Sequence, residues 1–453
     1  MQSSLCIGQE QAPGTACGLT SLPVETGPGN YFISNYPPYS TWQPEFVSEV
    51  DKVLSKPPAQ GVPLSLYVHV PFCRHRCRYC YFRVYEARPR GEVDAYIKLV
   101  LQELTKYIDQ PVIGGRPLQS VYFGGGTPSY LSARQIEQLL GGLQKIAPWK
   151  AVEEVTFECE PGTVTREKLK VLKDLGVTRI TLGFQSLDDG ILKANGRKTR
   201  ATECLRAYEW VRELAFREVN LDLMAGMLGE TDESWRKTIA KTVELRPDCS
   251  TIYQLELTYN SKLYDDIQKG RGAPLADWPT KRRWLGEALR MYEDAGYTIG
   301  SGYMAIRYPK TWRLVYTLEH FWHGADLIGV GESAFGHLQG VHYQNIDNTE
   351  QYGSMLAAGQ RPVRRARPLS EEERFRREVV LQLKTAALDA AYFRKKFGVE
   401  LSVKFQEQFE RLSRAGLLEI QGDAIRLTRE GLLQVDWLLP NFYLPEHVGI
   451  RYT

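Results

Sequence analysis

The stretch Tyr67-Val-His-Val-Pro-Phe-Cys73-Arg-His-Arg-Cys77-Arg-Tyr-Cys80-Tyr-Phe82 decides the fold. It begins in the β-rich run Leu64–Val70 and continues into a loop with three cysteines at intervals of four and three residues. Zinc usually takes four ligands, and His69 and His75 lie nearby, so a Cys3His zinc site is one alternative. Three thiolates with no fourth nearby would instead leave one iron of a 4Fe–4S cluster open to a cofactor or substrate.

The other cysteines of the chain follow no such spacing. Eight cysteines among 453 residues are too few for a disulfide scaffold. Those outside the loop are expected to be structural or incidental thiols: Cys6, Cys17, Cys159, Cys204 and Cys249. Within the loop, the basic side chains of Arg74, Arg76 and Arg78 are expected to favour the thiolate form and to offset the negative charge of a cluster.

The composition is that of an ordinary globular protein, with 43% hydrophobic and 25% charged residues. A length of 453 residues suggests two or three domains. The net charge of +3 creates no strong field that would attract nucleic acid or acidic lipid. The sequence has no apolar run of about 18 residues and no secretory signal at its N-terminus, so we expect no membrane span and a cytoplasmic location.

From residue 64 onward, β-rich runs alternate with stretches of helical period. The predicted strands are Leu64–Val70, Ser120–Phe123, Glu154–Glu158, Arg179–Phe184, Glu218–Met224 and Thr251–Leu257. The predicted helices between them include Glu92–Ile108, Ala133–Ile146, Arg166–Leu175 and Ala201–Leu214. This alternation predicts an α/β fold with a parallel sheet. Six such units would form an open or partial (β/α)6 barrel with its chemistry at the strand ends.

The flanks of this core differ in composition. Residues 1–63 form a predicted N-terminal arm, with an extended aromatic segment at Tyr31–Pro38 and a helix near Pro44–Leu54. The core is predicted over residues 64–360. The basic, proline-punctuated stretch Arg361–Pro368 is interpreted as a linker. Residues 361–453 then show helices followed by two short strands, Leu417–Ile420 and Ala424–Leu427, which resembles a winged helix.

The CxxxCxxC motif after a first strand is the signature of radical S-adenosylmethionine (SAM) enzymes, and the wider pattern resembles the branch of oxygen-independent coproporphyrinogen III oxidase. The resemblance covers about residues 31–438. It implies a 4Fe–4S cluster on Cys73, Cys77 and Cys80, and SAM bound at the open iron. It also implies that an electron from the reduced cluster splits SAM into methionine and a 5′-deoxyadenosyl radical, which abstracts hydrogen.

Further positions match the family at successive strand ends. Gly124-Gly125-Gly126-Thr127-Pro128 looks like the family's loop near the amino group of SAM, where Gly125, Gly126 and Thr127 are expected contacts. Glycines there would let the backbone approach a ligand. Glu158 resembles the family's SAM-contacting glutamate, and Asp222 fits its ribose-contacting aspartate.

The remaining expected contacts are aromatic or lie further along the chain. Gln185 and Arg197 match family positions near the ribose and the carboxylate of SAM. Tyr67 and Tyr79 would flank the cluster and the adenine. The segment Asp326–Phe335 also resembles the family, at a place where a second SAM can bind. Phe321 and Trp322, just before it, are either an adenine-stacking pair or ordinary core aromatics.

The resemblance leaves the product open. We expect C-methylation or cyclopropanation with a second SAM. The alternatives are oxidative decarboxylation of tetrapyrrole propionates, as in coproporphyrinogen III oxidase, and the haem chaperone type. The family's oxidases have Gly-Cys where this chain has Tyr81-Phe82, and Asp-His where it has Gly302-Tyr303, which weighs against the oxidase. The N-terminal arm resembles that of the oxidases, which weighs against the chaperone.

The expected partners follow from the same resemblance. The substrate would be planar or lipophilic, for example a tetrapyrrole. The electron would come from a flavodoxin- or ferredoxin-like donor. No nucleic-acid partner is expected, because arginines of the C-terminal part, such as Arg374, Arg376 and Arg377, are interspersed with glutamates in Glu371–Glu378.

Overall fold

The computed structural model describes residues 32–147, 149, 151–271, 275–308 and 313–452. The leader at residues 1–30, with Cys6 and Cys17, lies outside the described residues. Among the described residues, one large sheet has twelve strands in the order β14-β13-β12-β11-β1-β4-β5-β6-β7-β8-β10-β9. Its central part, from β11 to β8, is parallel throughout. The predicted α/β fold with a partial barrel is therefore confirmed, and the sheet is open.

The parallel strands are β1 (Leu64–Val70), β4 (Ser120–Gly125), β5 (Glu154–Cys159), β6 (Arg179–Gln185), β7 (Glu218–Ala225), β8 (Cys249–Gln254) and β11 (Asp326–Val330). The antiparallel strands are β9 (Thr298–Ser301), β10 (Met304–Ile306), β12 (Phe335–Leu338), β13 (Val341–Asn345) and β14 (Val363–Pro368). All six predicted strands are present. The last of them, β8, begins two residues earlier than predicted and ends at residue 254.

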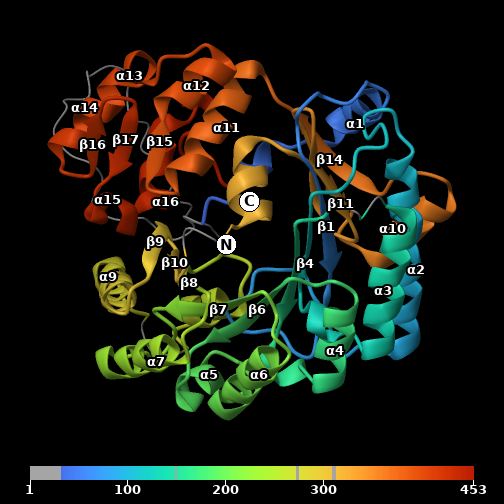
Figure 1. Cartoon of the computed structure of the whole chain (residues 1–453), viewed down its shortest axis with the longest axis horizontal. Helices are drawn as coiled ribbons and strands as arrows, with labels where there is room; N and C mark the ends of the chain where they lie inside the picture. The colour runs from blue at the N-terminus through green and yellow to red at the C-terminus, as the bar shows by residue number, and fades with distance from the viewer. Residues whose placement is uncertain (1–31, 148, 150, 272–274, 309–312, 453) are drawn as a thin grey trace, which may run out of the picture.

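Helices follow the strands and cover the outer side of the sheet (Figure 1). They are α2 (Arg90–Ile108), α3 (Ala133–Ile146), α4 (Arg166–Asp174), α5 (Asp189–Ala194), α6 (Ala201–Glu213), α7 (Asp232–Leu245), α9 (Trp278–Asp294) and α10 (Thr349–Ala357). The short helix α8 (Lys262–Gln268) lies against the cysteine loop instead, where the Leu263 amide donates to the Arg78 carbonyl oxygen at 2.7 Å. Polar side chains cap the N-termini of several helices. The Ser132 hydroxyl caps α3 in a capping box with Gln135, and Thr165 caps α4. Because β1, β4, β5, β6 and β7 are parallel, the loops that follow these strands lie at the same edge of the sheet.

The linker prediction for residues 361–368 is wrong. Residues 363–368 form β14, the edge strand of the large sheet, which pairs antiparallel with β13. Val363 and Ala366 are buried, whereas Arg364 is exposed. An edge strand commonly carries charged side chains on its open face, because they prevent pairing with another chain. The basic composition thus belongs to a strand.

The C-terminal part and the N-terminal arm share one hydrophobic core. The C-terminal elements are α11 (Glu371–Leu383), α12 (Ala390–Phe397), α13 (Leu401–Lys404), α14 (Gln406–Arg414), α15 (Arg429–Leu433), α16 (Val435–Leu438) and a small sheet of β15 (Ala387–Asp389), β16 (Leu418–Gln421) and β17 (Ala424–Leu427). Helices with a small ribbon agree with the winged-helix prediction. Tyr36 and Trp42 of the arm are buried in the same cluster as Phe375 and Phe405. The arm then continues into the 3-10 helix η2 (Pro44–Phe46) and the helix α1 (Val47–Leu54).

The arm is also tied to the C-terminal residues by hydrogen bonds. The Asn35 amide donates to the Tyr452 hydroxyl at 2.8 Å, and this hydroxyl donates to the Asn35 carbonyl oxygen at 2.8 Å. The Ser40 amide donates to the Tyr452 carbonyl oxygen at 3.3 Å. Segments from opposite ends of the described chain therefore lie side by side.

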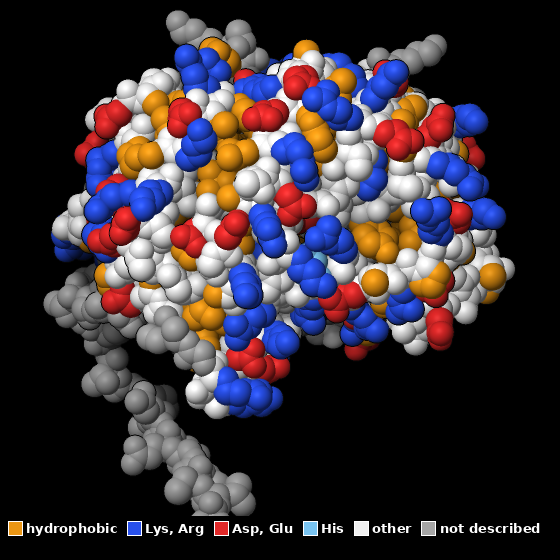
Figure 2. Space-filling model, turned by 90° about the horizontal axis from the view of Figure 1, so that it is seen from below, with side chains coloured by type: hydrophobic (Ala, Val, Ile, Leu, Met, Phe, Trp, Pro, Cys, Tyr) orange, Lys and Arg blue, Asp and Glu red, His pale blue; other side chains and the backbone are white. Residues whose placement is uncertain are grey.

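The surface carries both signs of charge. On the face in Figure 2, acidic and basic side chains are interspersed, with Lys and Arg gathered toward its lower centre. No helix among the described residues combines the length and the apolar character that crossing a membrane requires.

Candidate active site

The three cysteines of the motif lie in and after a short strand. Cys73 ends β2 (Phe72–Cys73), which pairs with β3 (Tyr85–Glu86), and Cys77 and Cys80 lie in the connecting loop. The Cys73 Sγ lies 3.2 Å from the Thr127 Oγ1. Burial raises the pKa of all three thiols, to about 12 for Cys73 and about 11 for Cys80. The three sulfurs are also close enough for each charge to act on the others.

The loop arginines have other partners than expected. Arg74 donates to the Gly162 carbonyl oxygen at 3.0 Å, and Arg78 forms an ion pair with Asp266 at 2.9 Å. Arg76 donates to the Cys80 carbonyl oxygen and is a minor influence on that thiol's pKa. Arg76 lowers the pKa of the Cys80 thiol, as expected, but burial outweighs its effect, and Arg74 and Arg78 are engaged with other partners.

The donor set suits a cluster better than a single zinc ion. Zinc needs its ligands within about 2.0–2.3 Å of one point. Among the described residues, no group of three or more His, Cys, Asp or Glu is arranged to hold one ion. The Nε2 atom of His69 is buried without a partner, and the Nε2 atom of His75 accepts from the Lys198 amide at 3.1 Å. Three thiols on one loop fit a cluster in which each thiolate binds a different iron.

The glycines after β4 are needed for packing against the segment that leads to Cys73. Gly125 has a φ of 114°, and a Cβ there would lie 2.7 Å from the His69 ring. A Cβ on Gly126 would lie 2.9 Å from the Phe72 carbonyl oxygen and 3.0 Å from that of Val70. The close approaches that require glycine are thus to the His69 ring at Gly125 and to the backbone of residues 70–72 at Gly126, and contact of these glycines with SAM stays a prediction.

Arg197 lies at the centre of a buried polar network beside the cysteine loop. Its guanidinium forms an ion pair with Glu160 at 2.5 Å, and donates to the Gly183 carbonyl oxygen at 2.6 Å and to the Tyr79 hydroxyl at 3.2 Å. It also lies 3.8 Å from the Cys77 Sγ. These contacts fix Tyr79 and one cysteine relative to the ends of β5 and β6.

Several buried polar atoms in this region have no hydrogen-bond partner among the described residues, and the Nε of Arg197 and the Oε1 of Gln185 are two of them. Gln185 ends β6 with a φ of 65°, at an irregularity in its pairing with β7. A buried polar group without a hydrogen bond is costly, so such atoms usually have a ligand or water partner. One donor and one acceptor fit a ligand with a carboxylate and hydroxyl groups, such as SAM.

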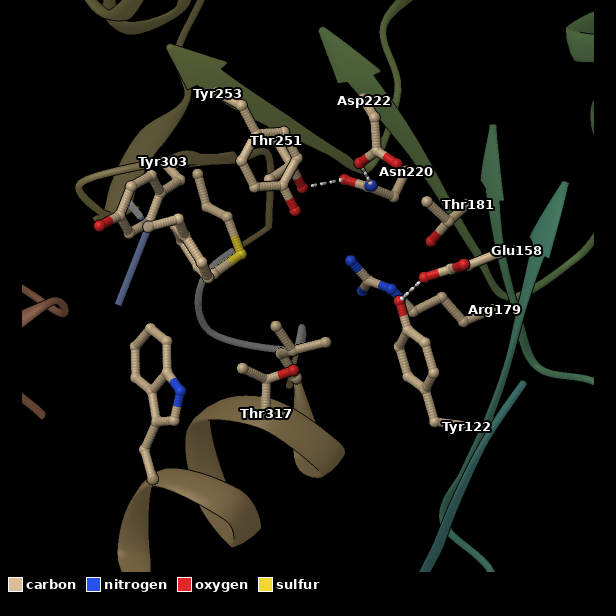
Figure 3. Close-up of a pocket in the computed structure, with 14 residues that line it drawn as sticks. Tyr122, Glu158, Arg179, Thr181, Asn220, Asp222, Thr251, Tyr253, Tyr303 and Thr317 are labelled. Carbon is tan, nitrogen blue, oxygen red and sulfur yellow. Dashed lines mark hydrogen bonds between the residues drawn. The ribbon is translucent and has the colours of Figure 1, made fainter. Parts of the chain in front are cut away.

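A cavity lies between strands β4 to β8 and the helical segment at residues 315–323 (Figure 3). Its lining residues are Phe32, Tyr122, Glu158, Arg179, Thr181, Asn220, Asp222, Thr251, Tyr253, Tyr303, Met304, Leu314, Thr317 and Trp322. The Tyr122 hydroxyl donates to Glu158 at 2.6 Å, and the Asn220 amide donates to Asp222 at 2.8 Å. The cavity therefore presents two carboxyl groups together with aromatic rings.

Burial raises the pKa of both carboxyl groups into the range near neutral pH. Burial raises the pKa of Glu158 to about 7, and the nearby Asp222 charge adds to the shift. Burial raises the pKa of Asp222 to about 6. Arg179 also lines the cavity, but its guanidinium is paired with Glu218 at 3.0 Å. Both acids can therefore change protonation near pH 7.

The predicted site residues fall into two neighbouring groups. Around the cysteine loop the structure brings together Cys73, Cys77, Cys80, Tyr79, Thr127 and Arg197. In the cavity wall it places Glu158 and Asp222. Tyr67 lies behind Tyr122, with ring centroids 6.1 Å apart, and its hydroxyl hydrogen bonds to His69. Gly125 and Gly126 lie between the two groups. The side chains of Gln185 and Arg197 both lie next to Gly183.

Several residues of the site are absent from the sequence prediction. Asn220, Thr251 and Tyr253 line the cavity, and Glu160 pairs with Arg197. Asn220 lies two residues before Asp222, and Tyr253 two after Thr251. Side chains two apart on a strand face the same side, so this alternation could have identified them.

The segment expected near a second SAM has structural partners. Asp326 begins β11 and pairs with Arg116 at 2.7 Å, and the Gly331 amide donates to the buried Glu103 at 2.7 Å. The two aromatic residues before this segment have different surroundings. Trp322 lines the cavity, whereas the ring of Phe321 packs against the Arg377 guanidinium.

Comparison with known proteins gives a consistent picture. The family model described as Radical SAM superfamily matches residues 67–241, and the HemN C-terminal domain matches residues 369–433. Heme chaperone HemW of Bacillus subtilis (strain 168) is 29% identical over 379 residues, covering 82% of this chain and 96% of that protein. Oxygen-independent coproporphyrinogen III oxidase of Pseudomonas aeruginosa is 28% identical over 414 residues, covering 87% of this chain and 88% of that protein.

The solved structures agree in fold. Coproporphyrinogen III oxidase (HemN) from Escherichia coli, a radical SAM enzyme, matches with a TM-score of 0.78 and 24% identity, covering 90% of this chain and 96% of that chain. These relatives are named for oxidation or haem handling, so they support the two alternatives over C-methylation. A 4Fe–4S cluster and SAM are the cofactors of this family. The chain therefore joins a radical SAM domain at residues 67–241 to a HemN C-terminal domain at residues 369–433.

Proposed function

We propose that the protein removes the carboxyl group from propionate side chains of a tetrapyrrole by radical SAM chemistry. The enclosure of the cavity by the N-terminal arm carries this proposal. Phe32 lines the cavity, and its amide donates to Glu256 at 2.6 Å. The next amide, of Ile33, donates to Asp436 at 3.0 Å. An enclosed site suits a radical reaction, because it keeps water and other reactants away.

In this proposal Cys73, Cys77 and Cys80 hold the cluster. When bound, the reduced cluster and SAM supply a 5′-deoxyadenosyl radical that takes a hydrogen atom from the substrate. The unpartnered Nε of Arg197 would donate to the SAM carboxylate, and the Oε1 of Gln185 would accept from a ribose hydroxyl. Thr127 orients Cys73 through its hydroxyl.

The cavity acids and the remaining predicted residues would complete the SAM site. Glu158 and Asp222 would accept hydrogen bonds from the SAM amino group and ribose, while Tyr67 and Tyr79 flank the cofactors. Gly125 and Gly126 allow the loop to lie against the cysteine segment.

The reaction must also remove an electron. Loss of a hydrogen atom from a propionate, followed by loss of carbon dioxide and of one electron to an acceptor, leaves a vinyl group. A flavodoxin- or ferredoxin-like protein is the proposed donor for reducing the cluster. The match to the oxidase supports this reaction, and it spans 414 residues against 379 for the haem chaperone.

Haem handling is the second candidate. Tyr81 and Phe82 favour it, since they stand where the oxidases of the family have Gly-Cys. A protein that only binds and passes on haem would need no turnover of SAM on a propionate substrate.

The test uses the full chain, reconstituted with iron and sulfide under anaerobic conditions and reduced with dithionite. We expect SAM to yield 5′-deoxyadenosine and methionine, and coproporphyrinogen III to yield vinyl products by mass spectrometry. Cys77→Ala should abolish both. Cys204→Ala, at a buried cysteine in α6, is the matched control and should retain them.

Three outcomes would overturn the proposal. Absence of SAM cleavage by a fully clustered protein would remove the radical reaction. S-adenosylhomocysteine together with a methylated product would instead indicate alkylation. Stoichiometric haem binding without substrate turnover would favour the chaperone.

A further inference from the structure

Exposed aromatic side chains follow the third cysteine of the motif. Tyr81 and Phe82 are 43% and 40% exposed, and their ring centroids lie 4.5 Å apart. Tyr259, from the loop after β8, is 40% exposed. Its neighbour Asn260 donates from its amide to the Tyr81 carbonyl oxygen at 2.9 Å, so the two loops are held together. These three rings, of Tyr81, Phe82 and Tyr259, are called the aromatic platform.

The aromatic platform lies at the edge of the site already described. Tyr81 directly follows the cluster ligand Cys80. Tyr259 continues from β8, whose Thr251 and Tyr253 line the cavity. Large aromatic side chains that gather on a surface, rather than scatter, usually mark a binding site. A ligand on these rings would therefore lie next to both the cluster loop and the cavity.

Two guanidinium groups border the aromatic platform. The Arg76 guanidinium donates to the carbonyl oxygens of Cys80 at 3.0 Å and Asn260 at 3.1 Å, and so links the two loops. The Arg451 guanidinium carbon lies 5.9 Å from the centre of the Tyr259 ring. Both arginines are exposed, and within the described parts of the chain neither guanidinium forms an ion pair, although the backbone amide of Arg76 donates to Glu86 at 2.7 Å. A surface with flat aromatic faces and positive edges complements a flat ligand that carries carboxylates.

We propose that Tyr81, Phe82 and Tyr259 bind the flat face of a conjugated tetrapyrrole, with Arg451 pairing with one of its propionates. That the ligand is a tetrapyrrole rests on the proposed function, whereas its conjugated, flat form is inferred from the exposed aromatic faces and its carboxylates from the positive edge of this surface. The pair Tyr81-Phe82 replaces the Gly-Cys of the family's oxidases, so the surface distinguishes this chain from them. A porphyrinogen, whose four rings are not conjugated into one plane, should bind more weakly than a porphyrin.

The test measures the binding of coproporphyrin III to the reconstituted full chain by absorbance and fluorescence titration. Tyr81→Ala/Phe82→Ala should weaken binding about tenfold, because two ring contacts are lost. Tyr81→Phe/Phe82→Tyr keeps both rings and should bind within about twofold of the parent. Tyr308→Ala removes an exposed aromatic outside the aromatic platform and is the control for nonspecific loss. Cluster absorbance reports whether each variant still holds its iron.

A second variant tests the charged edge away from the cysteine loop. Arg451→Gln should weaken coproporphyrin III binding about threefold to tenfold, and should leave binding of its tetramethyl ester unchanged. Equal affinity of the parent, Tyr81→Ala/Phe82→Ala and Arg451→Gln would overturn the inference, as would an equal loss in Tyr308→Ala. If the parent cleaves SAM but binds no porphyrin, the tetrapyrrole surface is wrong and the radical chemistry stands. If it binds porphyrin through these residues without cleaving SAM, the surface stands and the proposed function fails.

Discussion

At the scale of single residues, the Glu158 carboxyl group has few partners in the cavity wall: the Tyr122 hydroxyl at 2.6 Å and the Gly125 amide. Its pKa is raised from 4.5 to about 7. Between these values the folded protein keeps a proton that the unfolded chain has released. Folding therefore loses stability as the pH rises through this window, and the loss is complete above pH 7.

We expect Glu158→Gln to abolish this titration, since glutamine is neutral at every pH. In the protein without cofactors, the free energy of unfolding of the variant minus that of the parent should rise from near zero at about pH 4 to about 3 kcal/mol at about pH 8. Urea denaturation across this range measures the difference. Asp222→Asn should behave in the same direction, with its midpoint nearer 6 because the pKa of Asp222 is raised to about 6. A difference that is constant with pH would contradict this account.

Single residues could be predicted where a short stretch of sequence carries the pattern, and not where their role depends on partners far away in the chain. Cys73, Cys77 and Cys80 stand out by their spacing, and Glu158 and Asp222 follow from the resemblance to the family at successive strands. The pairing of Arg197 with Glu160 could not be predicted, because it joins residues 37 positions apart through the loops after two strands. That burial raises the pKa of the three thiols could not be predicted, because burial depends on packing that the sequence does not state.

At the scale of elements, the loop after β4 supports the cysteine segment by backbone contact. Gly126→Ala should push the Cβ against the Phe72 and Val70 carbonyl oxygens, which lie 2.9 Å and 3.0 Å from its ideal position. Since both are backbone atoms, the segment before Cys73 must shift. We expect iron and sulfide content after reconstitution to fall, and the free energy of unfolding to drop by about 1–3 kcal/mol.

Gly141→Ala is the matched control, in the interior of α3 with nothing within 4 Å of the added Cβ. It should leave the iron content unchanged and raise the free energy of unfolding by about 0.5–1 kcal/mol, because alanine favours the helix. Full iron content in Gly126→Ala would show that the contact with the cysteine segment is not needed.

Strand order could be predicted where it follows the chain. The βα alternation gave β1 and β4 to β8 because each parallel neighbour comes next in sequence. The strands on the other flank of the sheet, β11 to β14, come after α9 in the sequence. Of these, β11 pairs with β1, which lies more than 250 residues earlier in the chain. Hydrophobic periodicity contains no signal for such a pairing. The arginines of β14 further concealed its strand character.

At the scale of the whole molecule, Lys384 holds the arm over the cavity. It is fully buried, donates to the Ile33 carbonyl oxygen and lies 3.1 Å from Asp436. We expect Lys384→Met to lower the free energy of unfolding by about 3 kcal/mol, because Asp436 is left without its cation. Amide exchange at residues 32–36 should become faster, which mass spectrometry of the exchanged protein measures.

Lys404→Met provides the comparison, because Lys404 pairs with Glu372 at 3.0 Å with both side chains more than a third exposed. This change should cost less than about 1 kcal/mol and leave exchange at residues 32–36 as in the parent. Unchanged protection of the arm in Lys384→Met would show that other contacts hold it.

The bonds between Asn35 and Tyr452 join residues 417 positions apart. A ribosome must therefore synthesise nearly the whole described chain before the arm finds its partner. During translation, the strands around the cysteine loop emerge and can pair while the side that the arm later covers is still open. Iron, sulfide and any large ligand thus have their widest access to a nascent or newly released polypeptide, before its two distant segments meet.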